Sequence, residues 1–322
     1  MTQAGPRRWR QAAGRVPFID KWFRKLRRTD EIAALQAHLS LLRGYDAEPF
    51  LVWRPPGHFY SAVPSMKEIK EREGEIFTPP DHLVGLDLNE DAQLALLRTL
   101  APLTDGVTFN SDPQPDRRYY LNNPSYSMGD ALILQAVLRH LRPRRYLEIG
   151  SGWTTALALD TNEAWLDGAM QITCVEPYPT DLEKLLRPGD DVEVLARGVQ
   201  DIELERFAEL EPGDVLFIDC SHVVKTGSDA HHLITRVLPI VPVGVYIHIH
   251  DIFWAFEYPK DWVYEGRAWN ETYLLHAFLL FNPSFEIALF YDWLVQARRD
   301  VLERELPALL PGGGALWLRR RA

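Results

Sequence analysis

The chain has 322 residues and a mass of 37.0 kDa, which allows one large domain or a catalytic domain with an additional module. Its 46% hydrophobic and 25% charged residues are typical of a soluble globular protein and exclude a disordered chain, and 2 cysteines are too few for a disulfide scaffold. The net charge of -10 is unevenly spread: residues 1–28 hold nine Lys or Arg and one Asp, whereas the remaining chain holds 26 basic and 44 acidic residues. An acidic body argues against nucleic-acid binding by the main domain.

The basic first segment of the chain has two possible interpretations. It contains no apolar core of the kind that a secretory signal has, and the most apolar later stretch, residues 233–249, is interrupted by Arg236 and two prolines. We therefore predict a cytoplasmic protein without a transmembrane segment. Because Trp22 and Phe23 lie among basic residues, residues 7–28 predict weak contact with an anionic surface or a protein partner. The alternative is a solvated terminal helix.

The first third of the chain predicts helices separated by turns. Apolar side chains recur with a helical period at residues 30–43, and a second helix is predicted at residues 90–100. Prolines divide residues 51–80 into turns and short extended pieces. A polar stretch with two prolines follows the second helix, and there we place the boundary between a mostly helical accessory segment, residues 1–115, and the main domain, residues 116–322.

The main domain alternates apolar strands with amphipathic helices. Seven strands are predicted, at residues 146–149, 171–176, 191–195, 215–219, 245–250, 285–291 and 315–318. Helices are predicted at residues 131–141, 154–160, 181–186, 229–237, 271–281 and 301–310. Apolar strands separated by helices indicate an α/β fold, with a doubly wound, Rossmann-like, mostly parallel sheet of about seven strands.

The first strand of this domain runs into a glycine loop, residues 148–152 (EIGSG). In open α/β sheets ligands bind beyond the carboxyl ends of the strands, and two glycines let the backbone turn and approach a ligand closely. The second strand ends at Glu176, which can accept hydrogen bonds from ribose hydroxyls. A dinucleotide site would need a third glycine where Trp153 stands, and Glu148 would repel a pyrophosphate but suit a cationic ligand. The pattern favours S-adenosylmethionine (SAM), with an NAD-dependent oxidoreductase as the alternative.

On these residues the chain resembles the class I SAM-dependent methyltransferases, over about residues 119–322. The resemblance implies the following cofactor-binding residues: Glu148, Gly150, Ser151, Gly152, Glu176, Gln200, Asp201 and Asp219. In that family the glycine loop borders the amino-acid part of SAM, the acid after the second strand holds the ribose, and the residues after the third strand contact the adenine. Trp153 departs from the usual third glycine, which leaves the shape of the loop open.

Two later strands end on acids that predict a metal site. The fourth strand ends at Asp219 and Asp251 follows the fifth, so neighbouring strands would bring both carboxylates to the cofactor edge. Carboxylate oxygens suit Mg²⁺, and His250, if it also ligates, would favour Mn²⁺ or Fe²⁺. His222 is predicted as the general base that takes a proton from an acceptor hydroxyl acidified by the metal.

The Asp-x-x-His pattern, with an acid after the next strand, resembles the metal-dependent sugar and macrolide O-methyltransferases. The resemblance implies methyl transfer to a hydroxylated small molecule such as a sugar or a glycoside. His250 stands where that group has a second acid, so the metal site is altered. The aromatic and acidic segment at residues 253–271 predicts either an acceptor pocket or a loop packed on the sheet.

Other interpretations stay open at this point. Asp219 can instead cap the following helix, and His248 is more typical of a core histidine than of a ligand. His248, His250 and a distant third ligand could form a zinc site. The chain could also be a non-catalytic module that keeps the cofactor pocket and docks on a partner through its basic segment.

Overall fold

The computed structural model describes residues 32, 50, 53–107 and 109–322. The chain forms two compact units, Met1–Glu71 and Arg72–Ala322, each described here by itself. In the first unit, a series of turns leads to helix α3 (Met66–Glu71). The basic segment at residues 7–28 lies outside the described residues, as does the helix predicted at residues 30–43 apart from one position.

The second unit is built on one seven-stranded sheet. Its strands are β1 (Arg145–Ile149), β2 (Gln171–Val175), β3 (Val192–Leu195), β4 (Val215–Ile218), β5 (Tyr246–Ile249), β6 (Phe285–Phe290) and β7 (Leu316–Arg320). They lie in the order β3-β2-β1-β4-β5-β7-β6. Strands β1 to β5 are parallel, and β7 runs antiparallel to both of its neighbours. The predicted α/β fold with a mostly parallel sheet of seven strands is confirmed.

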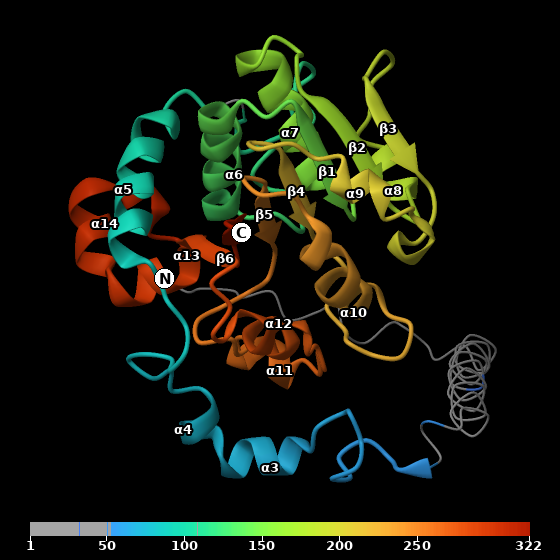
Figure 1. The fold of residues 1–322 in the computed structure, drawn as a ribbon, viewed down its shortest axis with the longest axis vertical. Coiled ribbons are helices and arrows are strands. Elements are labelled where there is room, and N and C mark those ends of the chain that lie inside the picture. The colour runs from blue at the N-terminus through green and yellow to red at the C-terminus, as the bar shows by residue number, and fades with distance from the viewer. Residues whose placement is uncertain (1–31, 33–49, 51–52, 108) are drawn as a thin grey trace, which may run out of the picture. The chain divides into compact units, whose positions relative to one another are not determined.

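Helices flank this sheet (Figure 1). The helices of the second unit are α4 (Glu73–Ile76), α5 (Glu90–Leu100), α6 (Met128–Leu141), α7 (Trp153–Trp165), α8 (Thr180–Glu183), α9 (Glu205–Ala208), α10 (Asp229–His232), α11 (Lys260–Tyr264), α12 (Glu271–Leu279), α13 (Tyr291–Ala297) and α14 (Arg299–Glu305). The helix predicted at residues 229–237 is α10 followed by a π-helical turn, Leu233–Val237. Among the described residues, no helix combines the length and the apolar character needed to cross a membrane.

The core lies between the sheet and the helices that cover it. Residues 129–138 of α6 are all buried, because this helix packs against α5 and α7 as well as the interior. Helix α5 also packs on β6, so residues 90–100 belong to the same compact unit as the sheet. The functional boundary that we expect between residues 115 and 116 stays a prediction.

The register of the parallel strands places their carboxyl ends in one row. Ile149 of β1 pairs with Val175 of β2 and with Ile218 of β4, and Ile218 pairs with Ile249 of β5. The residues that follow these strands therefore emerge at one edge of the sheet, where ligands bind in open α/β folds. This edge carries the site described next.

Candidate active site

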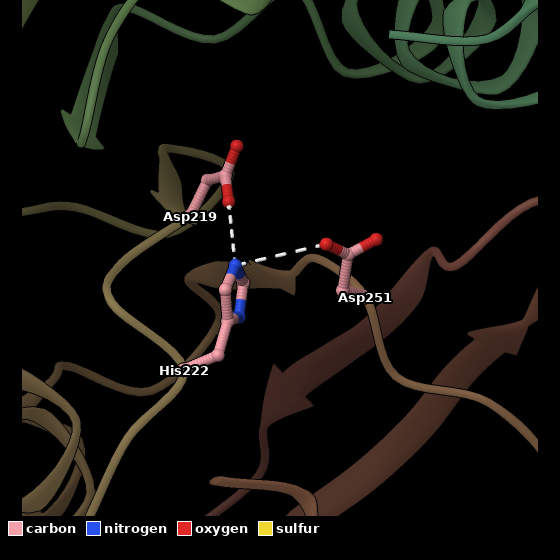
Figure 2. Close-up of side chains that lie close together, drawn as sticks. All are labelled: Asp219, His222 and Asp251. Atoms are coloured by element: carbon pink, nitrogen blue, oxygen red, sulfur yellow. Dashed lines mark ion pairs between the residues drawn. The ribbon is translucent and has the colours of Figure 1, made fainter. Parts of the chain in front are cut away.

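Two carboxylates and one imidazole converge at this edge. Asp219 follows β4 and Asp251 lies two residues beyond β5, and both point toward His222 (Figure 2). His222 Nε2 is 3.2 Å from Asp219 Oδ1 and 3.6 Å from Asp251 Oδ2. The three ligand atoms all lie within 4.8 Å of one another, a spacing that one metal ion can bridge. We call Asp219, His222 and Asp251 the metal triad.

The backbone at the metal triad is held in an uncommon conformation. His222 and Asp251 both have a φ of 58°, in the left-handed region that non-glycine residues seldom adopt. The carbonyl of His222 accepts hydrogen bonds from the amides of Asn270 (3.0 Å) and Glu271 (3.1 Å), at the start of α12. Such strain is kept where the surrounding contacts fix the residue, and it is common at functional sites.

Glu271 fixes the orientation of the imidazole. Its side chain is almost completely buried, and Oε2 lies 3.0 Å from His222 Nδ1. Its other oxygen accepts a hydrogen bond from Cys220 Sγ at 3.2 Å. With Nδ1–H donated to Glu271, Nε2 faces the two aspartates, the arrangement in which a carboxylate orients a metal-binding histidine. We did not predict Glu271, because an acid in the first turn of a helix is usually explained by capping and the helix dipole.

The residues of the metal triad stabilise one another in their charged forms. Burial lowers the pKa of His222, but hydrogen bonds with Asp219 and Glu271 outweigh this effect and raise the pKa to about 10. Burial raises the pKa of Asp219, but the hydrogen bond with His222 and the charge of His250 outweigh it, so this pKa is below its ordinary value. The two aspartates therefore attract positive charge, whether from a proton on His222 or from a divalent cation.

Two further histidines, His248 in β5 and His250 directly after it, are not in the group whose ligand atoms lie within 4.8 Å of one another. His250 is buried beside Tyr126, with a ring separation of 5.2 Å, and its Nε2 is 3.7 Å from Asp251 Oδ1. The ligand role expected for His250 stays a prediction. His248 is stacked on Phe217 at 4.1 Å, fully buried, and burial lowers its pKa well below the ordinary value. This environment matches the core role expected for His248.

The glycine loop between β1 and α7 has room for a ligand. A Cβ atom on Gly150, which has a φ of 94°, would lie 2.2 Å from the backbone oxygen of Asp219, so only glycine fits there. Gly152 has a φ of 143°, and its missing Cβ would meet nothing within 4 Å. The backbone at Gly152 therefore has open space beside it, and its contact with a cofactor stays a prediction.

Glu148 points into the protein. It is fully buried and accepts hydrogen bonds from Thr155 Oγ1 at 2.8 Å and from the Thr154 hydroxyl. Burial raises its pKa to about 8, although both hydrogen bonds act in the opposite direction. Glu148 thus ties the end of β1 to the first turn of α7. Its predicted contact with the cofactor is not tested by this geometry.

The remaining predicted cofactor residues are partly or fully accessible. Glu176 is half-buried directly after β2 and accepts a hydrogen bond from the amide of Tyr178 at 2.7 Å. Ser151 is also half-buried. Gln200 and Asp201 are exposed on a short helical turn after β3, where Gln200 Nε2 donates to the carbonyl of Gly227 at 2.8 Å. Because the strand ends are in register, Glu176 and the glycine loop lie at the same edge of the sheet.

A cavity of about 1250 Å³ adjoins the metal triad. Asp219 and Asp251 line it, together with His250 and Asp130. Its aromatic wall is formed by Phe253, Trp254, Phe256, Tyr258, Trp262 and Trp269. The aromatic segment, for which we expected either an acceptor pocket or a loop packed on the sheet, thus borders a space large enough for a small molecule. Glu148, Gly150 and Glu176 are not among the residues that line this cavity.

Residues 312–314, three glycines, complete the cavity wall. A Cβ on Gly313 would lie 2.2 Å from Asp130 Oδ1, and a Cβ on Gly314 would lie 2.8 Å from the Cα of Asp251. Only glycines allow the chain to lie this close to both acids. Sequence reasoning overlooked Asp130, which lies within α6, far in the sequence from the strand ends.

Comparisons with known proteins agree with this fold. Residues 147–252 match a family described as a methyltransferase domain. An uncharacterized protein from Archaeoglobus fulgidus is 36% identical over 165 residues, which cover 49% of this chain and 73% of that protein.

Solved structures with a similar fold include two methyltransferases. One is SAH-bound, from Podospora anserina, with 14% identity and a TM-score of 0.43, and the match covers 76% of this chain and 100% of that chain. The other is the O-methyltransferase TomG from Streptomyces achromogenes, involved in tomaymycin synthesis and solved with SAM. It has 14% identity and a TM-score of 0.37, over 79% of this chain and 97% of that chain.

Proposed function

We propose that this chain, which belongs to the class I SAM-dependent methyltransferases, methylates a hydroxyl oxygen of a small molecule with the help of a divalent cation. The observation that carries this proposal is the metal triad, whose two aspartates, Asp219 and Asp251, line the cavity of about 1250 Å³. Hydroxyl groups need activation before they can attack a methyl donor, and a metal ion is one way to supply it. In this proposal the acceptor enters the cavity, and its hydroxyl meets the metal ion that the triad binds.

For the cofactor, we propose binding at the glycine loop and at Glu176. The open space beside Gly152 admits a ligand close to the backbone, and Glu176 has an accessible carboxylate for the ribose. Glu148 would act indirectly, because its carboxyl is buried against Thr154 and Thr155 and keeps the loop in shape. SAM would supply the methyl group.

For the metal, we propose that Asp219, His222 and Asp251 are the protein ligands. A divalent cation held there would lower the pKa of an acceptor hydroxyl. Mg²⁺ suits the two carboxylates, whereas Mn²⁺ and Fe²⁺ accept an imidazole more readily, so metal preference is part of the test. We favour the ligand role of His222 over the base role expected from the sequence, because Nε2 faces both carboxylates and Nδ1 is engaged by Glu271.

The test is transfer of tritiated methyl from SAM to a panel of sugars, glycosides and catechols. We expect transfer that needs Mg²⁺ or Mn²⁺, stops with EDTA, and returns when the metal is restored. The Asp219→Asn variant should lose at least about a hundredfold in rate, since it removes a charged ligand. A matched control is Glu303→Gln, an exposed change on α14. Transfer that survives both EDTA and Asp219→Asn contradicts the metal proposal.

A further inference from the structure

Some of the charged side chains that line the cavity form ion pairs, and others do not. Its two long cationic side chains, Lys260 and Arg267, both have carboxylate partners. Lys260 pairs with Glu73, and Arg267 Nη2 lies 2.9 Å from Glu265 Oε2. Neither partner carboxylate is among the lining residues. The positive charges of Lys260 and Arg267 are therefore already balanced by carboxylates that do not line the cavity.

Three acids of the same wall have no such balance. Over residues 53–107 and 109–322, no ion pair is formed by Asp130, Glu257 or Asp292. Each lines the cavity, and none belongs to the metal triad. A divalent cation at the triad would be balanced by Asp219 and Asp251. His250 also lines the cavity, and nearby acids outweigh its burial and raise its pKa, but one protonated imidazole is fewer than the three acids. The cavity thus keeps an excess of negative charge when the metal and His250 are counted.

Neighbouring groups hold two of these acids in place without neutralising them. Glu257 Oε1 accepts hydrogen bonds from the Tyr273 hydroxyl at 2.6 Å and from the amide of Tyr258 at 2.9 Å. Asp292 Oδ2 accepts from the amide of Trp254 at 2.8 Å and from Gln296 Nε2 at 2.7 Å. These uncharged donors fix the carboxylates at the wall and leave their charge available to a ligand.

Asp130 is an independent indication of a ligand site, because it is buried and one of its oxygens is unpaired among the described residues. It is 4% exposed, yet Oδ1 has no hydrogen-bond partner among the described residues. Its other oxygen accepts from Ser127 Oγ at 3.1 Å and from the amide of Gly314 at 3.4 Å. A buried carboxylate oxygen without a donor costs free energy. Burial raises the pKa of Asp130 to about 6, which leaves it mostly charged at neutral pH.

The aromatic wall also suits positive charge. The guanidinium carbon of Arg267 lies 4.2 Å from the ring centre of Trp262 and 5.2 Å from that of Trp269. Tyr258 and Trp262 both pack edge-on against Trp269, which gives rings that face different directions. Cations bind favourably over such ring faces, and the energy rises as water is removed. The wall therefore already stabilises one cation of this chain.

We infer that the acceptor carries a positively charged amine in addition to the hydroxyl that is methylated. Asp130, Glu257 and Asp292 supply the negative charge that attracts the amine, and the aromatic rings cover its apolar part. Amino sugars, glycosides of amino sugars and hydroxylated aromatic amines have this chemistry. The inference rests on the proposed function, because it assigns the same cavity to the acceptor.

The test compares probes that share a hydroxylated scaffold and differ in charge. Dopamine, methylcatechol and dihydroxyphenylacetate form one series, and glucosamine, glucose and glucuronate form the other. Binding to the protein loaded with S-adenosylhomocysteine and Mg²⁺ is measured by calorimetry. We expect the amine of each series to bind about tenfold tighter than the neutral compound, with the carboxylate the weakest.

The double variant Glu257→Gln with Asp292→Asn should bring the ratio of amine to neutral affinity close to one. Both replacements keep an oxygen that accepts the observed hydrogen bonds. The control is Asp300→Asn with Glu303→Gln, two exposed changes on α14 that should keep the ratio. Equal or weaker binding of the amines, no detectable binding of them, or a ratio that survives the cavity variant overturns the inference.

Failure of the proposed function has a different signature. Titration of S-adenosylhomocysteine into the same protein reports on the cofactor site alone. If that compound does not bind, the methyltransferase proposal fails, whatever the probes do. If it binds and the amines show no advantage, only the inference about the acceptor fails.

Discussion

Replacing Glu148 with glutamine tests whether burial keeps this carboxyl neutral at the end of β1. Glu148 is fully buried, it accepts hydrogen bonds from Thr154 and Thr155, and burial raises its pKa to about 8. A carboxyl with a folded-state pKa above its unfolded value contributes stability that is fully present below about pH 4.5. This contribution is lost as the pH rises through about 8.

The size of the effect follows from the raised pKa. One pKa unit corresponds to about 1.4 kcal/mol, so between about pH 5 and pH 7 the wild type should lose roughly 3 kcal/mol through this group. Glutamine has no charge to bury and keeps an oxygen that accepts from a threonine hydroxyl. Relative to wild type, the Glu148→Gln variant should therefore gain about 3 kcal/mol of unfolding free energy over this pH range.

The assay is urea unfolding of both proteins at the two pH values. Other titrating groups are common to both proteins and cancel in the difference. The exposed variant Glu303→Gln should show no such gain. An equal pH dependence in wild type and Glu148→Gln would refute the argument that this carboxyl is neutral in the folded protein.

Three further predictions concern neighbouring parts of the fold. Gly313→Ala should cost about 2–3 kcal/mol in urea unfolding, because its Cβ would lie 2.2 Å from Asp130 Oδ1, and an unchanged midpoint would contradict the close approach. Arg118→Met should cost about 3 kcal/mol in the same assay, since the fully buried Asp160 loses its ion pair at 2.7 Å and keeps only the pair with Arg187 at 3.2 Å; a loss below about 1 kcal/mol would count against this. Glu271→Ala should weaken Mn²⁺ binding about 10–100-fold by electron paramagnetic resonance, because the imidazole that it orients is released, and an unchanged affinity would argue against that role.

The parts of the fold that sequence reasoning predicted are those with a strong local signal. Strand β4 is apolar throughout and buried at every position, so its existence followed from the sequence. Helix α5 has the predicted bounds, Glu90–Leu100. Helices α9, α11 and α13 were not predicted, because four to seven residues are too few to show a helical period. The antiparallel direction of β7 depends on the path of the chain, which no local pattern reveals.

At the candidate site, too, some features followed from the sequence and others depended on the whole fold. Asp219 and Asp251 could be placed together from the sequence because parallel strands end at one edge. His222 was expected beside the metal as a general base, but the orientation of its ring was not predictable, since it depends on a left-handed residue and on the start of α12. Asp130 and Glu271 were missed for a related reason. They reach the site only because α6 and α12 pack beside it, and such packing is decided by the whole fold.

The central claim is that the glycine loop and Glu176 bind SAM. Calorimetry with S-adenosylhomocysteine tests it most directly, with NADH as the competing ligand and Glu176→Ala as the variant. We predict that S-adenosylhomocysteine binds the wild type, that NADH does not, and that Glu176→Ala weakens binding at least about tenfold through the lost ribose contacts. Binding of NADH in place of S-adenosylhomocysteine, or an unchanged affinity in Glu176→Ala, would contradict the account.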